Sequence, residues 1–244
     1  MAQSYILTKS KYIHGLQCDR ALWLDVFNPK LARYTAEQMH RFDNGRKFEY
    51  AFKNTFSNGI DIRAELKRKI ESYPILTELL LDYEKEVDIF EAGFLYNEVL
   101  VLADVVHRRP DGSIDVYEVK SGTTLSDTYK RDVALQHYVI SHCRPIHSFN
   151  IVHNIPSRTH KDTDNSDYSE NSENSEISDK RFSIIDLTEE LPEQHSAIEK
   201  NIAAMKEILL HGEPATPTGQ HCLTPYACPY QHYCAQGIRQ LALF

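Results

Sequence analysis

Residues 99–120 read VLVLADVVHRRPDGSIDVYEVK, and this stretch decides the fold that we expect. Two apolar runs flank Pro110-Asp111-Gly112, where proline presets φ and glycine accepts a positive φ, so the sequence predicts a tight turn. A hairpin centred near Asp111 has Asp104 on one arm and Glu118 on the other. In an antiparallel pair these two carboxylates lie roughly opposite each other, which is the geometry that a shared cation requires.

Further elements are predicted on both sides of this hairpin. Helical patterns or helix signals occur within 4–26 after a short extended segment, and over 35–56, 64–82 (helix or loop), 130–142 and 195–211. Strand patterns occur over 86–90, 94–103, 104–107, 114–119, 149–153 and 182–187, the last two expected to pair. This order predicts an α/β fold with a mixed central sheet flanked by helices.

Five parts are expected along the 244 residues. They are an N-terminal helical segment (1–60), a central core (61–160), an acidic insertion (161–181), a last strand and helix (182–211) and a cysteine-bearing segment (212–244). The insertion is rich in Asp, Ser, Asn and Glu and has almost no large apolar side chains, so we expect it to be flexible.

The net charge of −8 is a property of one region. Residues 161–193 hold eleven acidic and three basic side chains, so the remainder of the chain sums to zero. Residues 1–53 hold nine Lys and Arg against five Asp and Glu, which allows a modest basic face for phosphates, although a solvated helix surface is the better explanation of these charges taken alone. The acidic total therefore does not exclude a nucleic-acid-binding protein.

Targeting signals are not evident. Residues 1–16 are polar and lack the apolar stretch of a signal peptide, and no apolar run approaches the length of a membrane span. Five cysteines in such a chain favour metal binding over a disulfide framework. We expect a soluble cytoplasmic protein without a membrane partner.

Asp104 and the tripeptide Glu118-Val119-Lys120 suit phosphate chemistry. The two carboxylates can hold Mg²⁺ or Mn²⁺, and the Val119 carbonyl can complete the site. Lys120 can orient a water or stabilise charge on an attacked phosphate. Glu and Lys at alternate positions also occur on ordinary exposed strands, so these residues alone leave both interpretations open.

Two helical motifs extend this pattern into a resemblance. With Gly45-X-X-X-Glu49 and Asp132-Val-Ala-Leu-Gln136-His-Tyr138, the hairpin residues resemble the motifs of the PD-(D/E)XK nuclease superfamily, and most closely its RecB-like branch, which includes the CRISPR-associated iron-sulfur exonucleases. The resemblance covers nearly the whole chain except the insertion. It implies a restriction-endonuclease-like core and a metal-dependent nuclease.

The resemblance also implies residue roles. Asp104 and Glu118 would be metal ligands, Lys120 the catalytic lysine, and Gln136 a residue that contacts the site or the DNA. Glu49 stands where the branch often has a histidine, and it would act as a further ligand. Ile140 stands where the branch usually has a tyrosine.

The cysteines have an unusual distribution. Cys18 stands near the start, and Cys222, Cys228 and Cys234 follow one another with five residues between neighbours. A single remote cysteine and wide spacing favour an iron-sulfur cluster over zinc, whose sites more often show close cysteine pairs; His221 or His232 could assist a zinc site. The resemblance implies a 4Fe-4S cluster that joins the two ends of the chain. Cys143 is expected to be a small buried residue.

Three functions follow from these expectations. The first is a DNA nuclease, an exonuclease acting on single-stranded or end-bearing DNA, with Mg²⁺ or Mn²⁺ and a 4Fe-4S cluster. The second is a noncatalytic nucleic-acid-binding or assembly subunit of a repair or defence complex, with a helicase or a similar protein as partner. The third is a regulatory domain held together by zinc.

Overall fold

The structure is a computed structural model that describes residues 5–67, 69–155 and 181–241. Its described strands form one seven-stranded sheet: β1 (Leu7–Thr8), β2 (Ile60–Asp61), β3 (Val87–Tyr96), β4 (Val99–Arg108), β5 (Ile114–Lys120), β6 (Ile146–Asn154) and β7 (Phe182–Asp186). The order across the sheet is β2-β3-β4-β5-β6-β7, and β1 pairs with β4 outside this path. The pairs β1/β4, β2/β3 and β5/β6 are parallel and the others are antiparallel, so the sheet is mixed as predicted.

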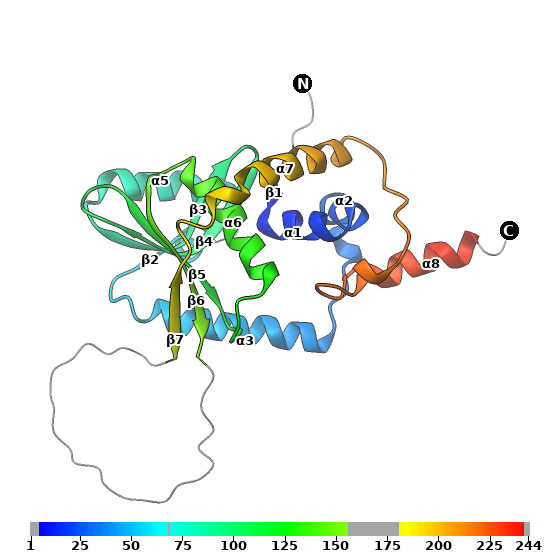
Figure 1. Cartoon of the computed structure of the whole chain (residues 1–244), viewed down its shortest axis with the longest axis horizontal. Coiled ribbons are helices and arrows are strands. Elements are labelled where there is room, and N and C mark those ends of the chain that lie inside the picture. Colours follow the sequence, from blue (N-terminus) through cyan, green and yellow to red (C-terminus); the bar gives the residue numbers. More distant parts are fainter. Residues whose placement is uncertain (1–4, 68, 156–180, 242–244) are drawn as a thin grey trace, which may run out of the picture.

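Helices lie on both sides of the sheet (Figure 1). They are α1 (Lys9–Gln17), α2 (Asp19–Phe27), α3 (Ala36–Lys53), α4 (Ile62–Leu66), α5 (Tyr73–Tyr83), α6 (Asp127–Ser141), α7 (His195–Leu209) and α8 (Gln231–Leu241). Short 3-10 turns occur at Pro29–Leu31, Ile70–Ser72, Pro192–Gln194 and Gln220–Cys222. The predicted α/β class is confirmed. Within the described residues, no helix has the length and apolar character needed to cross a membrane.

Two apolar clusters hold the layers together. A large one lies between the sheet and helices α1, α5, α6 and α7, and includes Val106, Val116, Leu135 and Ile140. A smaller one, with Phe52 at its centre, lies between the sheet and α3. Buried apolar surface of this kind supplies about 25 cal/mol per Å² toward folding. The functional side chains described below lie at the level of the sheet, between these two layers.

The predicted hairpin is confirmed. The amide of Gly112, with φ of +89°, donates to the carbonyl of Arg109 at 3.0 Å, and β4 pairs with β5 from Val105↔Tyr117 outward to the turn. One further step along this register brings Asp104 opposite Glu118.

One predicted strand is wrong. The apolar run over 94–103 is not continuous, because the chain reverses at Asn97 and Glu98, whose φ angles are +47° and +58°. Tyr96 pairs directly with Val99, so Asn97 and Glu98 form the two-residue loop of a hairpin, with positive φ at both positions. The usual Asn-Gly signal of such a loop is missing because the second loop residue is glutamate. Residues 104–107, predicted as a separate strand, continue the strand that begins at Val99.

Other predictions differ in detail. The helix expected within 4–26 is two helices separated by Cys18, whose φ of −165° and ψ of 124° are extended. The segment 64–82 forms α4, a 3-10 turn and α5. Strands β6 and β7 pair as predicted across the acidic insertion, which lies outside the described residues except for Arg181.

Candidate functional site

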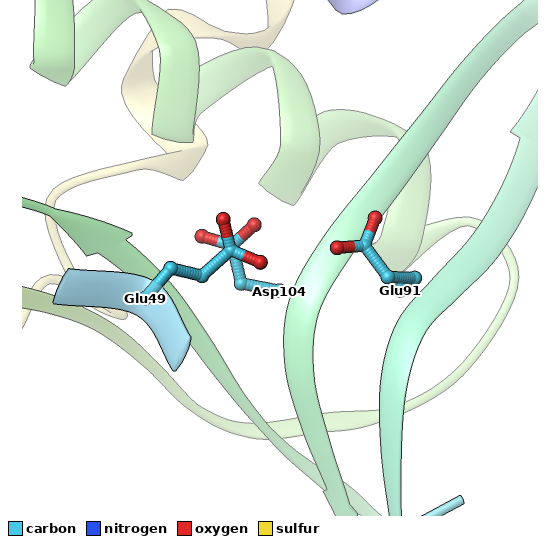
Figure 2. Close-up of side chains that lie close together, drawn as sticks. All are labelled: Glu49, Glu91 and Asp104. Atoms are coloured by element: carbon cyan, nitrogen blue, oxygen red, sulfur yellow. The ribbon is translucent and has the colours of Figure 1, made fainter. Parts of the chain in front are cut away.

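Three carboxylates meet at the middle of the sheet. Glu49 of α3, Glu91 of β3 and Asp104 of β4 each place an oxygen within 4.8 Å of the others. Figure 2 shows Glu49 reaching from its helix toward Asp104, with Glu91 on the neighbouring strand. Carboxylate oxygens at this spacing are the ligands that Mg²⁺ and Mn²⁺ prefer. Two of the three, Glu49 and Asp104, were predicted as ligands from the sequence.

A distortion of β3 creates this arrangement. Phe90 packs in the cluster under α3, and Glu91 also faces α3, where its carboxylate contacts Lys53; regular alternation would send one of the two to the opposite face. The φ of Glu91 is +56°, a conformation that costs a non-glycine residue of order 1–3 kcal/mol. Strain of this kind clusters at functional sites, and here it points a buried acid toward Glu49 and Asp104.

Two cations compensate Glu91. Lys53 Nζ lies 2.8 Å from its Oε1 and 2.5 Å from Glu49 Oε1, and Arg63 lies 2.6 Å from its Oε2. Burial raises the pKa of the Glu91 carboxyl, and the Lys53 and Arg63 charges act in the opposite direction. Glu91 was missed in the sequence, where its signal was a single acid inside an apolar strand.

Two strands converge head-on beside Asp104. Both β1 and β5 lie on the edge of β4 that is opposite β3, but β1 runs parallel to β4 and β5 runs antiparallel to it. Their carboxyl ends therefore point toward each other along β4. Lys9 immediately follows β1, and Glu118 and Lys120 lie at the end of β5. Lys9 and Glu118, 109 positions apart in the sequence, therefore meet between the ends of the two strands.

Glu118 is held by two lysines. Its Oε1 lies 2.8 Å from Lys9 Nζ and 2.5 Å from Lys120 Nζ, and its side chain is 1% exposed. Its second oxygen, Oε2, is buried and has no hydrogen-bond partner among the described residues. A buried oxygen without a partner costs roughly 1–3 kcal/mol, and a carboxylate oxygen of this kind can accept a hydrogen bond or ligate a cation.

Helix α6 closes the site. Asp132 Oδ2 lies 2.5 Å from Lys120 Nζ, and Asp132 Oδ1 lies 3.7 Å from Lys9 Nζ. One turn further along the helix, Gln136 is fully buried, and neither of its amide atoms has a hydrogen-bond partner within the described chain. Buried amides without partners are rare in folded proteins, and they occur where a water, ion or ligand completes the network.

The pKa values of the two hairpin carboxylates, Asp104 and Glu118, shift in opposite directions. Burial, together with the nearby Glu118 charge, raises the pKa of Asp104 well above its ordinary value. Burial would also raise the pKa of Glu118, but Lys120 and Lys9 lower it strongly. Burial would lower the pKa of Lys9, yet Asp132 and Glu118 raise it to about 12. The two lysines therefore favour the ionised form of Glu118, whereas burial and the Glu118 charge favour the protonated form of Asp104. The amide of Val119 donates to Asp104 Oδ2 at 2.7 Å and fixes its orientation.

The charges nearly cancel. Five carboxylates and four cations contact one another here: Glu49, Glu91, Asp104, Glu118 and Asp132 with Lys9, Lys53, Arg63 and Lys120. The balance is −1 with all groups ionised. One divalent cation would make it +1, which suits an anionic phosphodiester.

A cleft of about 990 Å³ opens onto Lys9, Lys120 and Asp132. Five Lys and Arg side chains line it (Lys9, Arg41, Lys47, Lys120 and Arg181), as do five aromatic ones (Tyr34, Phe42, Phe48, Tyr129 and Tyr226). The rings of Tyr34 and Phe42 form an edge-to-face pair with centroids 5.5 Å apart and are 46% and 45% exposed. Cations with exposed rings are the groups that bind single-stranded nucleic acids.

The four predicted cysteines line one small cavity. Cys18, Cys222, Cys228 and Cys234 surround it together with His221, whereas His232 does not line it. Burial and the neighbouring thiols of Cys18, Cys222 and Cys234 raise the pKa of Cys228 to about 11. In the described residues the four sulfur atoms do not form a set within 4.8 Å, and all are free thiols. Cys143 is half-buried rather than buried, beside the carbonyl of Leu95.

Polar contacts join the cysteine segment to the N-terminal helices. Gln17 Nε2 donates to the carbonyls of His221 and Tyr226 at 2.5 and 2.8 Å, and Tyr230 Oη donates to Asp25 at 2.6 Å. Gln38 of α3 donates to the carbonyl of Ala227 at 2.9 Å. Because Tyr226 and Ala227 also line the cleft, the thiol-bearing segment forms part of its wall.

The structure brings most of the predicted site residues together. Glu49 and Asp104 meet directly, and Glu118 and Lys120 lie beside them, with Lys120 in contact with α6. The predicted roles of Gln136 and of the Val119 carbonyl are untested and stay predictions. Lys9 and Asp132 were not assigned to the site from the sequence, and an isolated lysine before a helix offered no signal.

Comparisons with known proteins give limited information. No protein-family model matches the chain, and no curated protein is similar to it. The crystal structure of SSO0001 is similar over 88% of this chain and 80% of that chain, with 12% identity and a TM-score of 0.34. This similarity is too low to transfer a function.

Replacing Asp104 by asparagine should stabilise the metal-free protein and abolish Mn²⁺ binding. The folded-state pKa of Asp104 lies above its unfolded value, so its ionisation with rising pH opposes folding, and a neutral amide avoids this cost. We expect Asp104→Asn to raise the melting temperature by a few degrees at pH 8, with the gain shrinking as the pH falls to about 4. Scanning calorimetry measures the stability, and titration calorimetry with MnCl₂ measures the binding.

Glu71→Gln is the matched control, because Glu71 is exposed and outside the site. It should change stability by less than about 0.5 kcal/mol and leave Mn²⁺ binding intact. An Asp104→Asn protein that is less stable than the wild type at pH 8, or that binds Mn²⁺ equally well, would contradict this assignment.

Proposed function

We propose that this protein is a metal-dependent nuclease of the PD-(D/E)XK type that hydrolyses phosphodiester bonds in single-stranded or end-bearing DNA. The observation that carries the proposal is the convergence of Glu49, Asp104, Glu118 and Lys120 beside a basic, aromatic cleft. These groups come from α3 and from both arms of the hairpin. Their residue types match the roles that the sequence resemblance implies.

The donor set fits a Mg²⁺ or Mn²⁺ ion. Asp104 and Glu49 offer oxygens within 4.8 Å of each other, and Glu118 offers a buried Oε2 that has no hydrogen-bond partner in the described segments. Glu91 is a further oxygen donor, shared with Lys53 and Arg63. A bound divalent cation supplies charge stabilisation at the phosphate and lowers the pKa of a water. The strained backbone at Glu91 indicates that the acidic cluster is maintained at a cost in folding free energy.

The chain's own residues then position the reactants. Lys120 is fixed by Glu118 and Asp132 at 2.5 Å each, and its ammonium can hydrogen-bond a water or a phosphate oxygen. Attack of water on phosphorus breaks one P–O ester bond, and the departing oxygen takes up a proton. Gln136 is buried and has no hydrogen-bond partner among the described residues, and in this proposal its amide would complete the hydrogen bonding around the reacting groups.

The cleft supports a single-stranded substrate. Tyr34, Phe42 and Tyr226 present exposed rings at its wall, and Arg41 and Lys47 of α3 also line it. In a duplex the bases stack on each other and their faces are hidden, whereas in a single strand or a frayed end they can stack on protein rings. Each such contact is worth about 1–3 kcal/mol.

We further propose that Cys18, Cys222, Cys228 and Cys234 bind a 4Fe-4S cluster, with zinc as the alternative. Four thiols around one cavity, from both ends of the chain, support a site that takes four thiolates from scattered positions. The presence of His221 in the same cavity is the observation that keeps zinc in consideration. In either case the metal would stabilise the wall of the cleft.

A noncatalytic nucleic-acid-binding or assembly subunit is the second candidate. The near-complete pairing of five carboxylates with four cations favours it, because the lysines and the arginine already balance most of the acidic charge without a metal. A DNA-binding cleft would then remain useful for recruiting DNA to a helicase or another partner.

Cleavage of labelled DNA decides between the two candidates. With MnCl₂ or MgCl₂, the wild-type protein should degrade a labelled single strand. Glu118→Gln should reduce the rate by more than about 100-fold, because losing even an outer-shell partner of a metal site costs about 10- to 100-fold and Glu118 is a proposed ligand. Glu71→Gln should retain full activity. A wild-type protein that binds Mn²⁺ and single-stranded DNA but leaves single strands, duplexes and frayed ends intact would favour the noncatalytic subunit.

Removing the aromatic rings should weaken binding to single strands. In the Glu118→Gln background, which prevents turnover, Tyr34→Ala and Phe42→Ala should each raise the Kd for a single strand about 5- to 150-fold, since each stacked base contributes about 1–3 kcal/mol. Fluorescence anisotropy measures the Kd. Tyr50→Ala is the matched control, because Tyr50 is 68% exposed on α3, the helix that carries Phe42, but is not among the residues that line the cleft. Equal Kd values for all three variants would exclude stacking by this pair.

Metal analysis tests the thiol site. Protein purified without oxygen should be brown and contain about four iron and four sulfide ions per chain, and Cys228→Ser should lose both and melt roughly 10 °C lower. Cys143→Ser, which alters a cysteine outside the cavity, should keep the iron. Stoichiometric zinc with no iron would identify the zinc alternative, and protein with neither metal under these conditions would refute both.

A further inference from the structure

Lys9 has the contacts of an active-site residue. Its Nζ lies 2.8 Å from Glu118 Oε1 and 3.7 Å from Asp132 Oδ1, and Lys120 contacts the same two side chains. The two ammonium groups share one carboxylate oxygen, so both lie within hydrogen-bonding reach of a common point. A nuclease hairpin of the Glu-X-Lys kind already supplies one lysine, and Lys9 is therefore a second cation at the same place.

The position of Lys9 is fixed by the fold. It follows β1, whose Leu7 is fully buried, and it begins α1, whose first turn is capped by the Thr8 side chain. Tyr12, one turn further, is almost fully buried and accepts a hydrogen bond from Asn201 of α7 at 3.2 Å. Because the backbone is held on both sides of Lys9, the Cα of Lys9 is fixed near the carboxyl end of β5.

Lys9 also reaches the cleft. Its side chain is 27% exposed, and it lines the cleft together with Lys120 and Asp132. The buried Oε2 of Glu118 has no hydrogen-bond partner in the part of the chain that the structure describes, so a cation bound there would share the charge of the carboxylate and weaken its hold on Lys9. The Lys9 ammonium would then be free to turn toward an anion in the cleft, while Lys120 stays bound to Asp132 at 2.5 Å.

We infer that Lys9 is a second catalytic lysine, whose ammonium contacts a nonbridging oxygen of the scissile phosphate. The inference rests on the proposed nuclease function and adds to it a residue from the N-terminal segment. Lys9 forms no covalent bond and transfers no proton in this role. Its charge stabilises the negative charge that grows on the phosphate oxygens as water attacks and the P–O ester bond breaks.

Two readouts test this role. Lys9→Met keeps most of the aliphatic side chain and removes the charge; it should lower kcat about 10²-fold, and Lys9→Arg should recover part of the loss. For binding of a noncleavable phosphorothioate single strand, the slope of log K against log salt should become shallower by about 0.7 in Lys9→Met and stay near the wild-type value in Lys9→Arg. Lys11→Met, on the same helix but outside the cleft, should change neither quantity.

A positioning role predicts a different result. If Lys9 only orients Glu118, Lys9→Met should weaken Mn²⁺ binding to the protein and leave the salt slope unchanged, and that outcome would overturn the inference. Loss of the charge should instead leave the Mn²⁺ affinity equal or tighter, since Lys9 competes for the same carboxylate.

Failure of the proposed nuclease function and failure of the proposed role of Lys9 give different results. A wild-type protein that binds Mn²⁺ but cuts nothing would refute the function, and the salt slope would still report whether Lys9 meets a phosphate. Unchanged salt slope and at least half of the wild-type kcat in Lys9→Met would refute the role of Lys9 while the nuclease stands.

Discussion

Carboxylates buried at the level of the sheet require positive charge nearby, and the arrangement of the surrounding elements meets that requirement. An unpaired carboxylate away from water costs several kcal/mol, so Glu118 and Glu91 are stable only with their cations in place. Those cations come from separate elements: Lys9 from α1, Lys53 from α3 and Lys120 from β5. The positions of α1 and α3 against the sheet are therefore set by charge pairing as well as by apolar contact.

The same elements connect two sites of different chemistry. Helix α1 begins with Lys9 at the carboxylates, and Cys18 follows its last residue at the thiol cavity. The segment that bears Cys222 and Cys228 also provides Tyr226 to the wall of the cleft. The thiol cavity and the cleft therefore share one short helix and one loop.

Local chemistry explains which expectations were confirmed. The turn at Pro110–Gly112 depends on backbone preferences of adjacent residues, and it was predicted together with the alignment of Asp104 and Glu118. The turn at Asn97 and Glu98 was missed because it lacks glycine and interrupts an apolar run without changing its composition. Glu91 and Lys9 were missed because their partners lie 38 and 109 positions away, beyond any local pattern.

By itself the sequence determined the α/β class, the hairpin that aligns Asp104 with Glu118, and the set of cysteines that line one cavity. The first two follow from periodicity and turn chemistry, which act over short stretches of chain, and the third follows from the residue type and from the layout of one cysteine near the start and three near the end. Tertiary structure alone decided that β1 and β5 meet end to end on β4, that Glu91 turns toward α3, and that aromatic and basic side chains share a cleft. The reason is that these contacts depend on strand order and direction in the sheet, which the packing of the whole chain selects.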